Sequence, residues 1–209
     1  MLPLPEALLL FALHDDTGTV VSSAFLALDH TLRGAILAEL RLRGLVQTRA
    51  DGMMRLHPSP PEARLEPLLA RSLALLRAED AELSVADALT VLERGLPDLR
   101  ELISTELARR GILGESTISR MGLPDDVAHP SANHEPEAAL RRATSEAIDS
   151  DRDSLTPRLG TLIGLTVAAH LEEELFEDVD KAKGLADWVA EQDAVLRASR
   201  EAVERVEGW

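Results

Sequence analysis

The chain of 209 residues carries a formal net charge of −15, because 37 acidic side chains outnumber 22 lysines and arginines. This charge argues against non-specific nucleic-acid binding, which needs a basic surface. The absence of cysteine excludes disulfide bonds and thiolate metal sites, and an aromatic content of only 2% argues against stacking platforms for bases or sugars.

The first half of the chain predicts helices around one small β-hairpin. Apolar residues recur at helical spacing, while proline, glycine and capping residues mark helix starts and ends. The expected elements, in chain order, are a buried helix from Pro5 to about residue 13, a turn over 14–18, a helix over about 29–43 stopped by Gly44, a β-hairpin over 45–57, a helix over about 61–79, and a helix to about Arg94 opened by a capping box of Ser84 with Asp87.

The second half predicts further helices and one irregular segment. The longest apolar run, 159–169, is too short to span a bilayer and predicts a buried core helix. We expect one mainly α-helical domain over residues 1–209, without internal repeats. Its remaining elements are a helix opened by Pro97 and ending at Gly111, a polar loop or irregular hairpin over 112–132, a helix over about 135–148, a long helix from Thr156-Pro157 to about Phe176, and a last helix over about 180–206.

No motif in the sequence points to an enzyme. Asp16-Thr17-Gly18 matches the aspartic-protease triplet, but those enzymes pair two aspartates in a β-rich fold, so an Asp-Gly turn is favoured here. Serine-nucleophile, dinucleotide-binding and Walker motifs are missing, and the six histidines show no zinc-protease spacing. We therefore expect no catalytic residues, no metal site and no cofactor.

The arginines are the most informative charged residues. Arg33 is expected at the start of the helix over 29–43, where free N–H groups and the helix dipole favour an anion. The planar guanidinium fork suits phosphate. Residues 31–55 hold five arginines against two acids, a local charge of +3, and Arg100 lies near a second helix start. The pattern predicts an anion site, unless the arginines simply pair with the many carboxylates.

Several segments, in the same order and with similar gaps, resemble the Golgi phosphoprotein 3 family. The resemblance covers nearly the whole chain, and the abundance of arginine and alanine favours a bacterial, for example actinobacterial, branch. The most specific matches are Leu32-Arg33-Gly34 with residues 39–44, and Leu99-Arg100-Glu101 with residues 107–113; residues 4–10, 15–18, 129–130 and 157–159 continue the series.

The resemblance implies a central hydrophobic helix bundle ringed by amphipathic helices. It also implies a non-enzymatic peripheral membrane adaptor that binds phosphatidylinositol 4-phosphate, or another anionic phosphate headgroup, and protein tails. Two basic positions of the family's headgroup pocket carry over onto Arg33 and Arg100. The third falls on Pro97, and the pocket tryptophan falls on Ala24, beside Phe25.

The expected location is the cytoplasm, with peripheral contact at the inner face of the membrane, since no basic leader precedes the first helix. The family's membrane-attachment hairpin falls near residues 118–123. Because the net charge opposes an anionic surface, stable attachment would need orientation, a homo-oligomer or a partner.

Two alternatives remain open at this point. One is a winged-helix-like DNA-binding regulator, with the helix over 29–43 as its recognition helix and the following hairpin as its wing, placing Arg41, Arg43, Arg49 and Arg55 on DNA. The other is a protein-interaction scaffold that binds no lipid.

Overall fold

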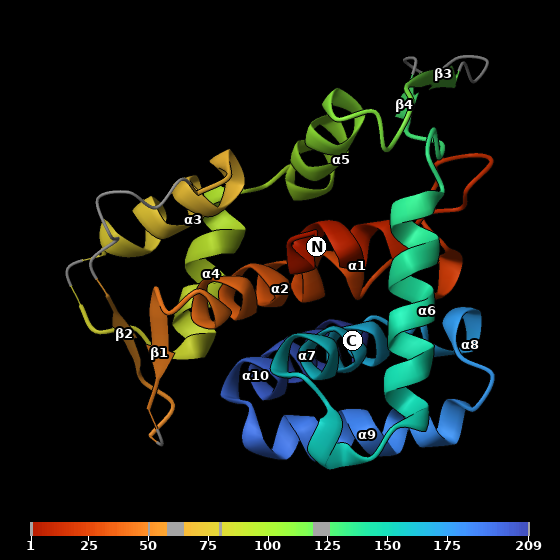
Figure 1. The fold of residues 1–209 in the computed structure, drawn as a ribbon. Coiled ribbons are helices and arrows are strands. Elements are labelled where there is room, and N and C mark those ends of the chain that lie inside the picture. Colours follow the sequence, from red (N-terminus) through yellow and green to blue (C-terminus); the bar gives the residue numbers. More distant parts are fainter. Residues whose placement is uncertain (1, 50, 58–64, 80, 119–125, 209) are drawn as a thin grey trace.

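A computed structural model describes residues 2–49, 51–57, 65–79, 81–118 and 126–208. Four helices pack against one another at its centre (Figure 1). They are α1 (Leu4–Ala12), α2 (Leu28–Leu42), α7 (Pro157–Ala168) and α10 (Ala194–Glu207). All nine residues of α1 are buried, as are eleven of the fifteen in α2. Apart from Glu6, which pairs with Arg110, α1 is apolar all round, and such a helix belongs inside a protein, which explains its central position.

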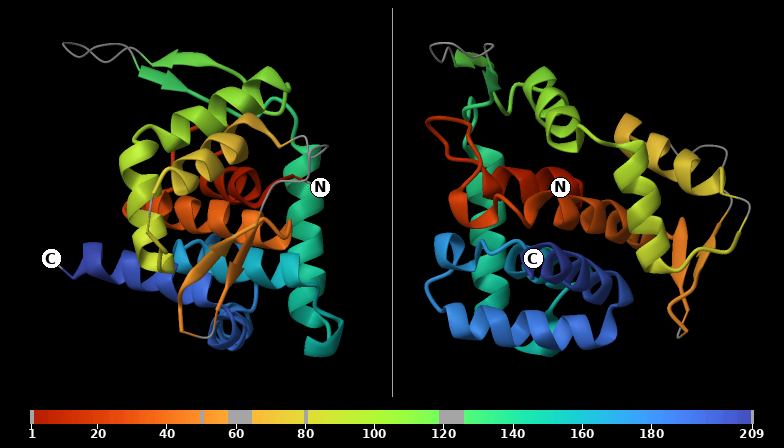
Figure 2. Two further views of the ribbon diagram at one scale, coloured as in Figure 1. Left: turned by 90° about the vertical axis from the view of Figure 1, so that its left-hand side faces the viewer. Right: turned by 180° about the vertical axis from the view of Figure 1, so that it is seen from behind.

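The remaining helices cover this centre. Figure 2 shows α9 on the side of α7 and α10 that faces away from α1, while α3 and α4 flank α2. The outer helices are α3 (Pro67–Arg77), α4 (Val85–Gly95), α5 (Leu99–Arg109), α6 (Glu135–Asp149), α8 (Glu172–Leu175) and α9 (Val179–Gln192). The expected mainly α-helical fold with a central apolar bundle is confirmed.

Two short antiparallel hairpins complete the described part of the chain. Strand β1 (Val46–Thr48) pairs with β2 (Met54–Leu56), which confirms the hairpin expected over 45–57. Strand β3 (Ser116–Ile118) pairs with β4 (Asp126–Ala128), so the second segment is an irregular hairpin rather than a loop. Most of the expected membrane-attachment hairpin, 119–123, lies outside the described residues. Among the residues that are described, no helix is both long and apolar enough to cross a membrane.

The turn at Gly18 explains two of the family segments. Gly18 has φ +65°, and a Cβ there would lie 2.1 Å from the backbone carbonyl carbon of His129. Only glycine allows both this conformation and this close approach. The expected Asp-Gly turn is therefore present, and its role is to pack residues 15–18 against His129-Pro130.

Two of the expected long helices are wrong, because each is broken in the structure. The helix from Thr156 ends at Ala168, and His170 then adopts φ 58° before the short α8. The last helix is broken at Asp193, whose carboxylate accepts the backbone N–H groups of Val195 and Leu196 and so caps α10. An aspartate inside an apparently continuous helical pattern is therefore a helix start here.

Two helix starts also differ from expectation. The helix expected over 61–79 begins at Pro67 and ends at Arg77, and residues 58–64 lie outside the described part. The helix expected from Pro97 begins at Leu99, because Pro97 and Asp98 form a turn. The capping box of Ser84 with Asp87 is confirmed at the start of α4.

Candidate anion-binding site

The C-terminal half of α2 is part of a buried charge network. Glu39 has a fully buried side chain and accepts two hydrogen bonds from Arg158, both at 2.8 Å, and one from Arg43 at 2.8 Å. It also accepts the backbone N–H of Leu4 at 2.9 Å. Burial would raise the pKa of Glu39, but these hydrogen bonds outweigh it and lower the pKa. This network joins α2 to α7 and to the start of α1.

The other arginines of this segment are also paired. Arg43 continues to Glu66 with bonds of 2.7 and 3.0 Å, and Arg41 pairs with Asp193. Arg49 pairs with Asp51. The local charge of +3 therefore does not form a basic surface, because most of these arginines are matched by carboxylates, several of them from distant parts of the chain.

This arrangement leaves the winged-helix alternative without support. A recognition helix needs an exposed face that can enter a DNA groove. Most of α2 is buried between α1, α4, α7 and α10 instead. In the β1–β2 hairpin Arg49 is paired with Asp51, and Arg55 has no carboxylate partner among the described residues.

Arg33 is different from the arginines that follow it. Its side chain belongs to a residue only 6% exposed, yet it makes no hydrogen bond or ion pair with any described residue. Its Nε is fully buried and unpartnered. The expected place at a helix start is wrong, because α2 begins at Leu28 and Arg33 lies in the second turn. The free N–H groups of the first turn therefore lie away from it.

Gly34 explains how Arg33 is brought close to α10. A Cβ at Gly34 would lie 2.0 Å from the Oγ of Ser199, so only glycine allows α2 and α10 to approach this closely. The neighbouring Arg33 is then held at the junction of α2, α4 and α10, where it lines a cavity.

Arg100 lies near the start of α5, as expected, but it is already bound. Its Nε and Nη2 donate to the two oxygens of Asp29 at 2.6 and 3.0 Å, and Nη2 also donates to the carbonyl of Phe25 at 2.9 Å. The guanidinium lies over the Phe25 ring, 5.3 Å from its centroid. Its Nη1 has no partner among the described residues.

Arg33 and Arg100 both line an open groove of about 560 Å³, which we call the α5 groove. It contains the two arginines and His30, but also four carboxylates. The lining residues are Phe25, Leu26, Asp29, His30, Arg33, Glu93, Pro97, Asp98, Leu99, Arg100 and Glu101. Ala24, at the position of the family's tryptophan, is fully buried, whereas Phe25 is 59% exposed and supplies the aromatic ring. Pro97 lines the groove without a charge.

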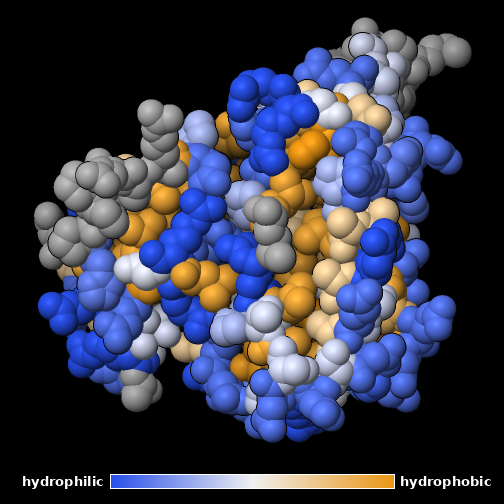
Figure 3. Space-filling view, viewed as in Figure 1, coloured by the Kyte–Doolittle hydropathy of each residue, from blue (hydrophilic) through white to orange (hydrophobic). Residues whose placement is uncertain are grey.

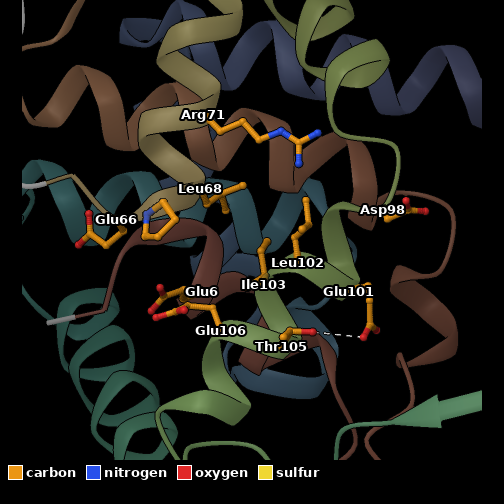
Figure 4. A pocket seen from close by; sticks show the side chains of 11 residues that line it. Glu6, Glu66, Leu68, Arg71, Asp98, Glu101, Leu102, Ile103, Thr105 and Glu106 are labelled. Atoms are coloured by element: carbon orange, nitrogen blue, oxygen red, sulfur yellow. Dashed lines mark hydrogen bonds between the residues drawn. The ribbon is translucent and has the colours of Figure 1, made fainter.

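A second cavity, of about 500 Å³, lies between α3 and α5 (Figure 4). Leu68, Leu102 and Ile103 form its apolar part, and Figure 3 shows apolar surface among the polar side chains around α5. Its rim carries five carboxylates and one arginine, Arg71, which donates to the carbonyl of Gly95 at 2.9 Å. The acids are Glu6, Glu66, Asp98, Glu101 and Glu106. This cavity repels anions.

Sequence reasoning missed His30 and the pairing of Arg100. Histidine at position 30 showed no metal spacing, and its place beside Arg33 appears only when α2, α4 and α10 are packed. The partner of Arg100, Asp29, is 71 residues away in the sequence.

The family comparison agrees with the observed fold. The protein-family model described as Golgi phosphoprotein 3 (GPP34) matches residues 4–206, nearly the whole chain. No curated protein matches the sequence.

Proposed function

Because the chain belongs to the Golgi phosphoprotein 3 family, we propose that it is a non-enzymatic, peripheral membrane adaptor. It binds an anionic phosphate headgroup, phosphatidylinositol 4-phosphate or an analogue, at the α5 groove. Arg33 is the main contact, and Arg100 contributes through its Nη1. The phosphate is the ligand class that suits a planar, permanently charged guanidinium.

The observation that carries this proposal is the unpaired guanidinium of Arg33. A charge taken out of water without a partner is strongly unfavourable, and natural proteins rarely keep one. Arg41 on the same helix also has a buried Nε without a partner, but its guanidinium pairs with Asp193, whereas Arg33 has no carboxylate partner among the described residues. A phosphate oxygen at this position would supply the missing partner.

Two exposed apolar side chains support contact with a lipid surface. Phe25 and Leu26 are 59% and 57% exposed, and both line the groove that holds Arg33. Burying such side chains in the lipid interface is favourable by about 25 cal/mol per Å². The four carboxylates of the groove and the net charge of −15 oppose binding, so we expect weak attachment that is lost at high salt.

Vesicle sedimentation tests the proposal. Purified protein is spun with phosphatidylcholine vesicles, with and without phosphatidylinositol 4-phosphate, at low salt. We expect lipid-dependent sedimentation that Arg33→Gln abolishes and Arg100→Gln reduces. Arg142→Gln on α6 removes the same charge from an exposed position away from the groove and should have little effect. Equal sedimentation of all variants, or none for the wild type, would contradict the proposal.

The cavity between α3 and α5 favours a second role, docking of a protein segment. An apolar floor under a carboxylate rim suits a short segment that carries both leucine-like and basic side chains. Fluorescence anisotropy with a labelled peptide of alternating leucine and lysine tests this. Leu102→Asp and Glu106→Lys should each weaken binding, whereas unchanged binding in both variants would remove this role.

A further inference from the structure

A narrower cavity adjoins the α5 groove on the other side of Arg33. It has a volume of about 200 Å³ and lies between α2, α4 and α10, and we call it the α10 niche. His30, Arg33 and Glu93 line both the niche and the groove, so the two are continuous. The residues of the niche are His30, Arg33, Ala86, Leu89, Thr90, Glu93, Ala202, Arg205 and Val206.

The niche contains a second arginine without a carboxylate partner. Arg205, in the last turn of α10, donates from Nε to the carbonyl of Glu201 at 3.1 Å and forms no ion pair with a described residue. Its side chain is exposed, so it is free to reach an anion at the mouth of the niche. Arg33 supplies a cation from the buried side.

The balance of charge separates the niche from the groove. The niche has two arginines and one carboxylate, that of Glu93. The groove has two arginines and four carboxylates, and one of these, Asp29, already holds Arg100. A dianionic phosphate is attracted by an excess of fixed positive charge and repelled by nearby carboxylates. The charge balance of the niche is therefore also favourable for a phosphate.

We propose that the α10 niche is a second phosphate subsite, continuous with the α5 groove, in which Arg205 binds an anion together with Arg33. This inference rests on the proposed function only in taking Arg33 as a phosphate ligand. Arg100 lies outside the niche, where it binds Asp29 and the carbonyl of Phe25 at the edge of the groove. A headgroup phosphate and a free phosphate monoester offer the same oxygens to the two guanidinium groups.

His30 provides a third contact on the same wall. It lies close enough to Arg33, Arg205 and Glu93 for their charges to act on it. Burial lowers the pKa of His30, and the charge of Arg33 lowers it further. A neutral imidazole still donates one N–H to a phosphate oxygen, and its protonated form adds a charge.

Calorimetric titration of the full chain with inorganic phosphate, and separately with sulfate, tests the site. Losing a charge-assisted contact costs roughly 1.5 kcal/mol or more, so Arg205→Gln should weaken binding at least about tenfold. Glu93→Gln should strengthen it, because a repelling carboxylate is removed. The control Arg142→Gln should leave it unchanged. A loss in Arg100→Gln without a loss in Arg205→Gln would overturn the inference.

The vesicle assay separates the two sources of the phosphate and the two proposals. If Arg205→Gln reduces both vesicle sedimentation and phosphate binding, the niche holds a lipid headgroup. If the wild type binds inorganic phosphate through Arg205 but never sediments with vesicles, the niche is a site for a free phosphate and the membrane role is wrong. Vesicle binding that needs Arg33 and Arg100 but not Arg205 supports the proposed function and overturns the niche. Absence of both kinds of binding overturns both.

Discussion

The two halves of α2 use arginine in opposite ways. In the C-terminal half, Arg43 joins Glu39 in a network that also includes Arg158 and the backbone of Leu4. In the N-terminal half, Arg33 is only 6% exposed, and it has no partner among the described residues. The charges of the first region are paired within the chain, whereas Arg33 has no carboxylate partner among the described residues, and we propose that a bound anion supplies one.

This comparison shows why arginines counted along a sequence do not reveal a basic surface. Five arginines between residues 31 and 55 suggested a local positive patch. Folding brings Asp193 and Glu66 to two of them, and it buries Arg33 without a partner among the described residues. The functional signal is a buried guanidinium that no carboxylate of the described residues neutralises.

The largest expected effect on stability comes from the C-terminal half of α2, where the charges are paired. Glu39→Gln would leave Arg158 and Arg43 without their buried carboxylate, and removing one member of a buried pair costs about 3–5 kcal/mol. Urea unfolding at neutral pH measures this loss. Glu106→Gln breaks a pair with the exposed Arg109 and should cost less than about 1 kcal/mol. Equal losses in the two variants would contradict the assignment of the network as buried and cooperative.

The difference in stability between wild type and Glu39→Gln should depend on pH. The folded pKa of Glu39 lies below its usual 4.5, so its stabilising charge is present above that value and is lost as the pH falls through the lowered pKa. The difference in stability between wild type and Glu39→Gln should therefore narrow in acid. A difference that stays constant from neutral pH to below pH 4 would show that the hydrogen bonds of Glu39 do not depend on its charge.

The next largest effect is expected at the contact between Gly34 and Ser199, which positions Arg33 beside α10. Gly34→Ala places a methyl group against Ser199 and should cost about 1–3 kcal/mol, because α2 and α10 must move apart. The same movement separates Arg33 from Arg205, so phosphate binding should fall as well. Gly184→Ala, on α9 with open space around it, serves as the control. Unchanged phosphate affinity in a destabilised Gly34→Ala would show that the helix contact does not position the niche.

A smaller effect is expected from the titration of His30, which lies beside Arg33. Sulfate is used because it does not titrate near neutrality. A bound anion favours the protonated form of His30, so sulfate affinity should rise as the pH falls towards the lowered pKa of His30 in the free protein and level off below it. Asp29, Arg33, Glu93 and Arg205 surround this histidine and set the size of the effect.

The control for this pH effect is His30→Gln, which keeps one hydrogen-bond donor but cannot gain a charge. Calorimetric titration at a series of pH values should show a flat affinity for this variant. A pH dependence that is equal in wild type and variant would assign the titrating group elsewhere, and a wild-type affinity that falls in acid would contradict the sign of the argument.

Much of the fold followed from local patterns in the sequence. The capping box at Ser84, the stop at Gly44 and the apolar run within 159–169 each depend on neighbours in the chain, and the structure confirms them. The breaks at His170 and Asp193 were missed because the apolar periodicity continues across them. A break of this kind is decided by tertiary packing and by a capping bond.

The candidate site was only partly predictable. Arg33 and Arg100 came from a motif resemblance, and the structure does bring them to one groove. Arg100 is paired because Asp29 binds it. Arg33 is buried because α2 packs closely against α10. Arg205, far along the chain, gave no signal in the sequence, because its position near Arg33 is a property of the folded helices alone.

The most direct test of the comparison is the thermal unfolding midpoint of wild type and Arg33→Met, each with and without inorganic phosphate. Replacing an unpaired buried charge with an apolar side chain of similar length should leave the midpoint unchanged or raise it in phosphate-free buffer. Phosphate should raise the midpoint of the wild type alone, because only the wild type gains binding energy. A variant that is less stable without phosphate, or that is stabilised by phosphate as much as the wild type, would show that Arg33 is a structural arginine like Arg43.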